Sequence, residues 1–310
     1  MCSSDLNQFF WKGLIILISP FFLSQVLFAQ TAEVKLLVLG VMQDGGLPQL
    51  GCNKSCCANA PYRKSVASLA IVNAASRQYT LIDATPDIIA QSQLVNSMFA
   101  EASIQSVFLT HAHIGHYTGL MQLGREAMNA KNVQVYAMPR LLSFLSTNGP
   151  WNQLVQLKNI ELQSLQNDLS VQLDGYTITP LLVPHRDEYS ETVGFRIKGI
   201  RKSLLYIPDI DKWSKWNRQL IQEIEKVDYA FLDGTFYADG EVNRPMSEIP
   251  HPFVTETIEL LRNVPLSIRQ RVYFTHFNHT NPLINPSNSV GDQVRKLGFQ
   301  LAKEGTLISL

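Results

Sequence analysis

The sequence predicts an α/β protein whose strands end in residues able to bind metal. Short apolar runs of strand length alternate with longer helix-forming stretches across residues 34–310. All seven histidines stand at or near the end of a predicted strand. Open α/β architectures place their chemistry at strand ends, so we expect these histidines to share one edge of the fold.

Composition favours a globular protein with a small-molecule partner. The 310 residues are 45% apolar, enough to bury a large core, in one layered domain or in two. The 26 basic and 26 acidic residues give a net charge of zero. This balance gives no electrostatic reason to expect binding to nucleic acid or to an anionic membrane surface.

The first residues differ in kind from the rest. Residues 13–27 form an apolar run that follows Lys12 and precedes Phe28-Ala29-Gln30, which predicts a secretory signal over residues 1–29. The alternative is an uncleaved anchor. No other stretch is long and apolar enough to span a bilayer, so we expect a periplasmic or secreted domain over residues 34–310 without stable membrane insertion after cleavage.

The predicted domain begins with a strand over residues 34–40 and a glycine-containing loop. Gly45-Gly46 suits a loop folded close over a site, and Asp44 is either a ligand of metal or substrate or an ordinary turn residue. Cys52, Cys56 and Cys57 follow. In an exported protein they indicate a disulfide with one unpaired thiol or, as the rival, a small zinc-binding loop.

The densest chemical signal follows the apolar run 106–109. A hairpin over residues 67–72 and 79–84 and a helix over residues 88–99 come first. His111, His113 and His116 then fall within six residues, where a strand ends and a helix begins. Alternate histidines on extended backbone project to one side, and neutral imidazole is a common zinc ligand. This spacing indicates a metal site.

The remaining elements continue the alternation. They are a helix over residues 119–130, strand 133–137, helix 141–148, strands within 151–182, strands 192–197 and 203–208, helix 215–225, strand 229–233, helix 255–263 and strand 271–275. His185, Asp209, Asp233 and His276 stand at or just after the ends of predicted strands of this series.

The histidine hexapeptide resembles the His-x-His-x-Asp-His motif of the metallo-β-lactamase fold superfamily, with Gly115 at the Asp position. Gly45-Gly46-Leu47-Pro48-Gln49, followed by the cysteines, resembles the PqqB family, whose members serve pyrroloquinoline quinone biosynthesis. The resemblance spans essentially residues 34–310. It implies a four-layer αβ/βα sandwich in which two packed sheets carry helices on both outer faces and metals at one edge.

The resemblance also implies ligands and roles. The first metal takes His111, His113 and His185, the second takes His116 and His276, and Asp209 bridges them. Asp211 is the fallback for Asp209. Asp83 is expected to support the motif, Asp209 and Asp233 to handle a proton, and His251 to contact substrate, while His279 has no assigned role.

Gly115 removes a carboxylate that family members use at the second metal. That site should bind more weakly unless Asp44, Asp233 or another oxygen replaces the missing ligand. We therefore expect one or two zinc ions, with iron or manganese as alternatives, since a mixed set of imidazoles and carboxylates suits these metals too.

The predicted function is exported, metal-dependent hydrolysis of a small ester, amide, lactone or phosphoester. In this reaction metal-bound hydroxide attacks and the metal stabilises the oxyanion. The PqqB resemblance offers an alternative, an iron-dependent oxidative step in quinone cofactor metabolism. A third possibility is a non-catalytic metal or cofactor carrier.

Overall fold

The computed structural model describes residues 34–60, 63–186, 188–242, 245, 248–285 and 288–310. The signal predicted over residues 1–29 lies outside the described residues. The first sheet contains β1 (Val34–Gly40), β2 (Ser68–Asn73), β3 (Gln78–Ile82), β4 (Ser103–Phe108), β5 (Val133–Ala137), β6 (Ile160–Ser164) and β14 (Leu307–Ser309). The second contains β7 (Val171–Leu173), β8 (Tyr176–Leu182), β9 (Val193–Lys198), β10 (Ser203–Ile207), β11 (Tyr229–Asp233), β12 (Val272–Thr275) and β13 (Gln300–Leu301).

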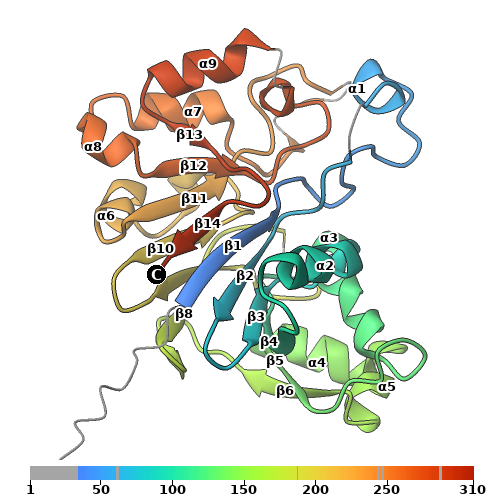
Figure 1. The fold of residues 1–310 in the computed structure, drawn as a ribbon. Coiled ribbons are helices and arrows are strands. Elements are labelled where there is room, and N and C mark those ends of the chain that lie inside the picture. The colour runs from blue at the N-terminus through green and yellow to red at the C-terminus, as the bar shows by residue number, and fades with distance from the viewer. Residues whose placement is uncertain (1–33, 61–62, 187, 243–244, 246–247, 286–287) are drawn as a thin grey trace, which may run out of the picture. The chain divides into compact units, whose positions relative to one another are not determined.

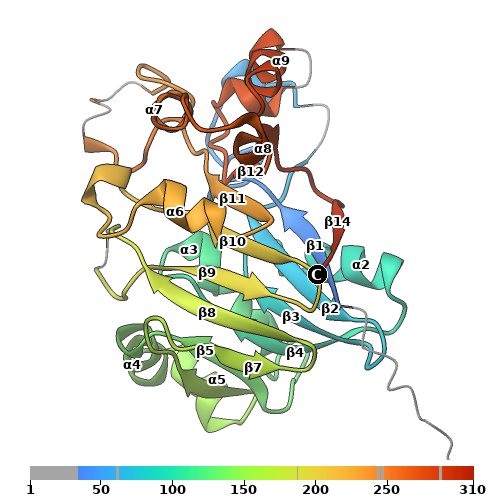
Figure 2. The same ribbon diagram turned by 90° about the vertical axis from the view of Figure 1, so that its left-hand side faces the viewer.

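Helices flank both sheets. The α-helices are α1 (Ser55–Ala58), α2 (Ile88–Met98), α3 (Ile114–Tyr117), α4 (Pro139–Thr147), α5 (Trp151–Gln156), α6 (Leu220–Glu225), α7 (Val254–Leu260), α8 (Leu266–Arg269) and α9 (Ser289–Lys296). Short 3-10 segments occur at η1 (Thr118–Leu123), η2 (Trp213–Lys215) and η4 (Pro282–Ile284). Helices α2 to α5 lie beside the first sheet and α6 to α9 beside the second (Figures 1 and 2).

Strand direction gathers the functional loops at one edge. The first sheet has the order β14-β1-β2-β3-β4-β5-β6 and the second β13-β12-β11-β10-β9-β8-β7. Strands β3 to β6 run parallel, and so do β10 to β13. Two successive antiparallel pairings separate β1 from β3 and β8 from β10, so β1 and β8 share the direction of these parallel sets. The loops after β1, β3, β4, β8, β10, β11 and β12 therefore leave from matching ends.

The core fills three spaces, one between the sheets and one between each sheet and its helices. Between the sheets, the Phe108 and Phe195 rings meet edge to face at 5.9 Å, and the Tyr176 hydroxyl donates to Thr80 at 2.7 Å. A separate buried cluster, which includes Leu81, Val107, Val135 and Leu141, joins the first sheet to its helices. The outer face of the second sheet is covered in the same way, since residues of α6, α7 and α9 are buried against it. This arrangement confirms the predicted four-layer α/β sandwich.

Two predicted elements were wrong. Residues 119–130 do not form one helix: η1 ends at Leu123, and Gly124 is extended with φ −65° and ψ 168°. The break falls at Gly124, a residue type of low helix propensity. The stretch 151–182 begins with α5 rather than with a strand. Among the described residues, no helix is long and apolar enough to cross a membrane.

Candidate metal centre

The first cluster of candidate ligands is built from three imidazoles and one carboxylate. His111 and His113 follow β4, His185 follows β8 and Asp209 follows β10. His111 Nε2 lies 2.8 Å from His113 Nδ1 and 3.2 Å from Asp209 Oδ2, and His185 Nε2 lies 3.1 Å from Asp209 Oδ1. One ligand atom from each residue lies within 4.8 Å of the others. Three histidines with an open position are the ligand set of many catalytic zinc sites.

The second cluster adjoins the first through Asp209. It contains Asp44, His116 and His276, with His116 Nε2 3.4 Å from Asp44 Oδ1 and 3.3 Å from His276 Nε2. Asp209 Oδ2 lies 3.9 Å from His116 Nε2 and 3.8 Å from His276 Nε2. The structure thus brings all six sequence-predicted metal ligands together, with Asp209 between the two groups.

Burial and unmet polarity show that a cation fits this centre. The Asp209 side chain is 2% exposed and those of His111 and His185 1%. Within the described part of the chain, Asp44 Oδ1, Asp209 Oδ1 and both ring nitrogens of His185 are buried without a hydrogen bond. Such buried polar atoms are costly unless a partner satisfies them. Divalent cations bind imidazole nitrogen and carboxylate oxygen, so the donor set fits a metal ion.

Charge and burial set the protonation of these ligands. Burial alone would raise the pKa of Asp209, but the charges of His185, His251 and His276 hold it well below the ordinary value. Burial, assisted by the charge of His116, lowers the pKa of His111 well below its usual range. A carboxylate and a neutral imidazole are the forms in which these residues coordinate metal.

Two aspartates orient the imidazoles through hydrogen bonds, either directly or by way of a threonine. Asp83 follows β3 and accepts from Thr110 N at 2.8 Å, from Thr110 Oγ1 at 3.0 Å and from His116 Nδ1 at 2.8 Å. Thr110 Oγ1 also lies 2.9 Å from His111 Nδ1. In the tautomers that fit these contacts, Nε2 of both His111 and His116 remains available to a metal. Asp83 can therefore support the histidine motif, as predicted, through its hydrogen bonds with Thr110 and His116.

Asp233 plays the matching part in the second sheet. Its Oδ1 accepts from Thr235 Oγ1 at 2.7 Å, and Thr235 Oγ1 lies 2.9 Å from His276 Nδ1. Its Oδ2 accepts from Ile210 N at 3.1 Å and from His251 Nδ1 at 2.8 Å. Since Asp233 is fully buried and its oxygens are engaged, this carboxylate positions His251 and His276. Thr110 and Thr235 were not identified from the sequence, where a threonine beside a ligand or carboxylate carries no distinctive signal.

We expect Asp83→Asn to weaken metal binding about 10- to 100-fold, the cost typical of changing a residue that orients a ligand. Asparagine tolerates the left-handed backbone that Asp83 adopts, φ 67°, so the fold should survive. The amide accepts more weakly from His116 than the carboxylate does. Calorimetric titration with Zn²⁺ would measure the effect, and unchanged affinity would show that Asp83 does not orient the ligands.

The centre reaches solvent at His113 and Asp44, whose side chains are 14% and 26% exposed. At this opening His113 Nε2 lies 3.2 Å from Arg186 Nη2 and 3.7 Å from Glu188 Oε2. Deeper in the site, His251 Nδ1 lies 3.2 Å from Asp209 Oδ1. Burial alone would lower the pKa of His251, but Asp233 and Asp209 raise it to about 9. Arg186 and Glu188, whose side chains are 57% and 52% exposed, therefore present charges of both signs at this opening.

A third cluster, separate from the metal centre, contains the three cysteines. Cys52, Cys56 and Cys57 are free thiols, and one atom from each lies within 4.8 Å of the others and of a nitrogen of His279. His279 Nδ1 is buried without a hydrogen bond in the described part of the chain. Three thiolates and one imidazole form a usual structural zinc set. Of the two alternatives that the sequence left open, the geometry favours zinc, and it gives His279 a place.

We expect Cys57→Ser to lose about one equivalent of zinc and to melt at a lower temperature, because four ligands are needed to close a tetrahedral site. His279→Ala should behave alike, and Ser55→Ala in the same short helix serves as the control. Elemental analysis and thermal denaturation would measure both effects. Equal zinc content in Cys57→Ser and the native protein would reject this site.

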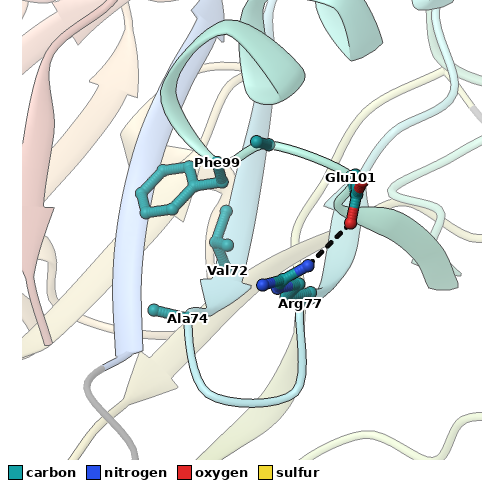
Figure 3. A pocket seen from close by; sticks show the side chains of 6 residues that line it. Val72, Ala74, Arg77, Phe99 and Glu101 are labelled. Atoms are coloured by element: carbon teal, nitrogen blue, oxygen red, sulfur yellow. Dashed lines mark hydrogen bonds and ion pairs between the residues drawn. The ribbon is translucent and has the colours of Figure 1, made fainter.

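A pocket of about 390 Å³ lies elsewhere, at the turn between β2 and β3 (Figure 3). Val72, Ala74, Phe99 and an exposed ion pair of 2.7 Å between Arg77 and Glu101 line it. The turn precedes β3 whereas Asp83 follows β3, so this pocket stands at the opposite end of the strand from the metal centre. It contains none of the candidate ligands.

Comparison with known proteins agrees with this geometry. A family model described as a beta-lactamase superfamily domain matches residues 78–277. Coenzyme PQQ synthesis protein B of Xanthomonas axonopodis pv. citri is 27% identical over 311 residues, covering 89% of this chain and 100% of the relative. Its namesake in Rhizobium meliloti is also 27% identical, covering 91% and 99%.

Solved structures show the same fold. Zn(2+)-bound PqqB from Methylobacterium extorquens superposes with a TM-score of 0.75 at 23% identity, covering 89% of this chain and 100% of that one. A diphosphatase from the PhnP family gives 0.64 at 22% identity, covering 90% and 97%. Because the family model covers well over half of the chain, the protein belongs to the metallo-β-lactamase superfamily, and the curated relatives that it resembles along most of its length are PqqB proteins.

Proposed function

We propose that the protein is a PqqB-like, metal-dependent enzyme that carries out an oxidative step on a small phenolic precursor of a quinone cofactor. Its curated relatives are named for coenzyme PQQ synthesis, which supports a role in quinone cofactor metabolism over the hydrolase expected from the motif order. One observation carries the proposal: two groups of imidazoles and carboxylates converge on the buried Asp209 and reach solvent at His113, beside Arg186. Mixed sets of this composition with open positions suit iron(II).

The residues of the chain have separable tasks in such a step. His111, His113, His185 and Asp209 would hold one ion, and His116 and His276 would contribute to a second. A bound redox metal supplies electron transfer and activation of oxygen. Arg186, 57% exposed at the opening, can pair with the carboxylate of an amino-acid substrate, because guanidinium and carboxylate match in geometry. His251, held by Asp233, presents a protonated imidazole beside Asp209.

Metal-dependent hydrolysis is the second candidate. The first cluster supports it, because three histidines with a free position are the set that catalytic zinc uses to lower the pKa of a bound water to about 7. His251 would then donate a proton to the leaving group. Both candidate functions need the same ligands. They are distinguished by which metal the purified protein binds and by which co-substrate it consumes.

The test measures metal content and oxygen consumption together. Protein purified without added metal is analysed for iron, zinc and manganese. It is then incubated with tyrosine or 3,4-dihydroxyphenylalanine and ascorbate in an oxygen electrode. The His113→Ala protein corrects for spontaneous oxidation. Iron in the centre with oxygen uptake above that control supports the proposal. Zinc without oxygen uptake, together with cleavage of bis(p-nitrophenyl) phosphate or p-nitrophenyl acetate, would replace it with hydrolysis.

Export is part of the same proposal. It rests on the apolar run over residues 13–27, and cell fractionation with N-terminal sequencing of the mature protein tests it. A mature chain that begins near Gln30 outside the cytoplasm is expected. Full-length protein in the cytoplasm would contradict it.

A further inference from the structure

We propose that Asp44 supplies the carboxylate ligand of the second cluster in place of the aspartate that the histidine motif lacks at Gly115. We further propose that the two positions are coupled, so that a side chain at position 115 would displace Asp44. This inference rests on the metal centre of the proposed function and assigns a ligand from a different part of the chain.

Asp44 and a side chain at position 115 would compete for the same space. A Cβ built at Gly115 would lie 2.2 Å from Asp44 Oδ1, 2.6 Å from its Cα and 3.0 Å from its Cγ. The backbone of Gly115 is not left-handed, so its conformation does not require glycine. What requires glycine is Asp44, which fills the volume where the motif's own side chain would begin. Carboxylates at both positions would be mutually exclusive without movement of the backbone.

The Asp44 carboxylate is oriented toward the two imidazoles of the second cluster. Asp44 Oδ1 points to the same place as the two imidazoles, 3.4 Å from His116 Nε2, and it has no hydrogen bond in the described part of the chain. His116 and His276 each direct Nε2 inward, because Asp83 and Thr235 occupy their Nδ1 atoms. Two imidazoles and one carboxylate that meet in this way form a set able to hold a divalent cation.

Hydrogen bonds fix the position of the loop that carries Asp44. The loop that carries Asp44 is joined to the segment that carries His276 by Gln43 N to the Phe277 carbonyl at 2.8 Å and by Phe277 N to the Val41 carbonyl at 2.8 Å. The Asn278 amide donates to Gln43 Oε1 at 2.6 Å. A ligand held from a rigid backbone loses little freedom when it binds, so Asp44 is preorganised beside His276.

The experiment counts and titrates bound metal rather than turnover. Asp44→Asn removes the charge at constant size. Gly115→Ala changes none of the proposed ligand residues but puts a Cβ into the volume of Asp44. In calorimetric titration with Zn²⁺ and in elemental analysis, both variants should lose one equivalent, or bind one ion at least about 100-fold more weakly, while the ion at His111, His113 and His185 is retained.

Two controls come from helix α9. Asp292→Asn changes an exposed carboxylate, and Gly291→Ala adds a Cβ whose nearest neighbours are 3.5 Å away, an ordinary contact. Both should bind metal like the native protein. Native affinity for every ion in Asp44→Asn would overturn the inference, and so would native binding in Gly115→Ala. If Gly115→Ala fails to melt cooperatively, Asp44→Asn decides alone. Absence of oxygen uptake with all ions bound would count against the proposed function and leave this ligand assignment standing.

Discussion

Replacing Asp209 with asparagine is expected to weaken both metal sites at once, each by at least about 100-fold in affinity for Zn²⁺. Asp209 lies between the two clusters: Oδ2 is 3.2 Å from His111 and 3.8 Å from His276, and Oδ1 is 3.1 Å from His185. The amide keeps the shape and removes the negative charge that six surrounding histidines share. Calorimetric titration and elemental analysis would measure the loss.

The matched control for this change is Asp211→Asn. Asp211 is two residues away, and its carboxylate accepts from Lys215 Nζ at 2.6 Å and from Lys212 N at 2.7 Å, outside either cluster. The control should retain native metal content. If Asp209→Asn lost only one ion, the bridging role would be wrong and Asp209 would belong to a single site. If it lost none, the metal centre would have to be sought elsewhere.

The fold and most of the centre were predictable because their signals are local. A strand of four or more apolar residues that ends in histidine or aspartate is visible without tertiary information, and His111, His113, His185 and Asp209 were identified in this way together with the family motif. The residues within 182–207 were correctly divided between strand and loop for the same reason, since β9 and β10 are short, apolar and separated by polar turns.

The remaining features depend on contacts that no local pattern contains. Asp44 stands 71 positions from Gly115 in the sequence, and its carboxylate reaches the place where the motif lacks one because β1 and β4 run in the same direction and their loops leave from the same edge. His279 is far from the cysteines along the chain, so its place beside them follows from the loop after β12. The helix predicted over 119–130 was wrong for a local reason instead, since Gly124, a poor helix former, ends the helical segment.

Glu223→Gln is expected to destabilise the protein by about 2 kcal/mol at pH 7, because it breaks a nearly buried ionic network whose cations are partly solvated. Glu223 in α6 is 4% exposed. It pairs with Arg196 of β9, with Lys226 at 2.8 Å and with Arg218 at 3.6 Å. The variant leaves Arg196, a quarter exposed, without its carboxylate partner. Urea denaturation would measure the change in free energy of unfolding.

The pH dependence of this effect has a definite sign. Burial alone would raise the pKa of Glu223, but the hydrogen bond from Lys226 and the charge of Arg196 lower it below the ordinary value of 4.5. A carboxyl whose pKa is lower in the folded state stabilises the protein at pH values above its unfolded pKa, and the stabilisation is lost as the pH falls through the folded value. The difference between native and Glu223→Gln proteins should therefore be constant from pH 6 to 8 and shrink below about pH 4.5.

Glu101→Gln is the control for Glu223→Gln, since Glu101 is 79% exposed and forms the ion pair with Arg77 shown in Figure 3. Exposed pairs contribute about 0 to 1 kcal/mol, so this variant should unfold almost like the native protein. A difference for Glu223→Gln that stayed unchanged down to pH 3 would mean that lost packing, rather than lost charge, causes the destabilisation. A difference no larger than that of Glu101→Gln would mean that solvent screens the network as fully as it screens a surface pair.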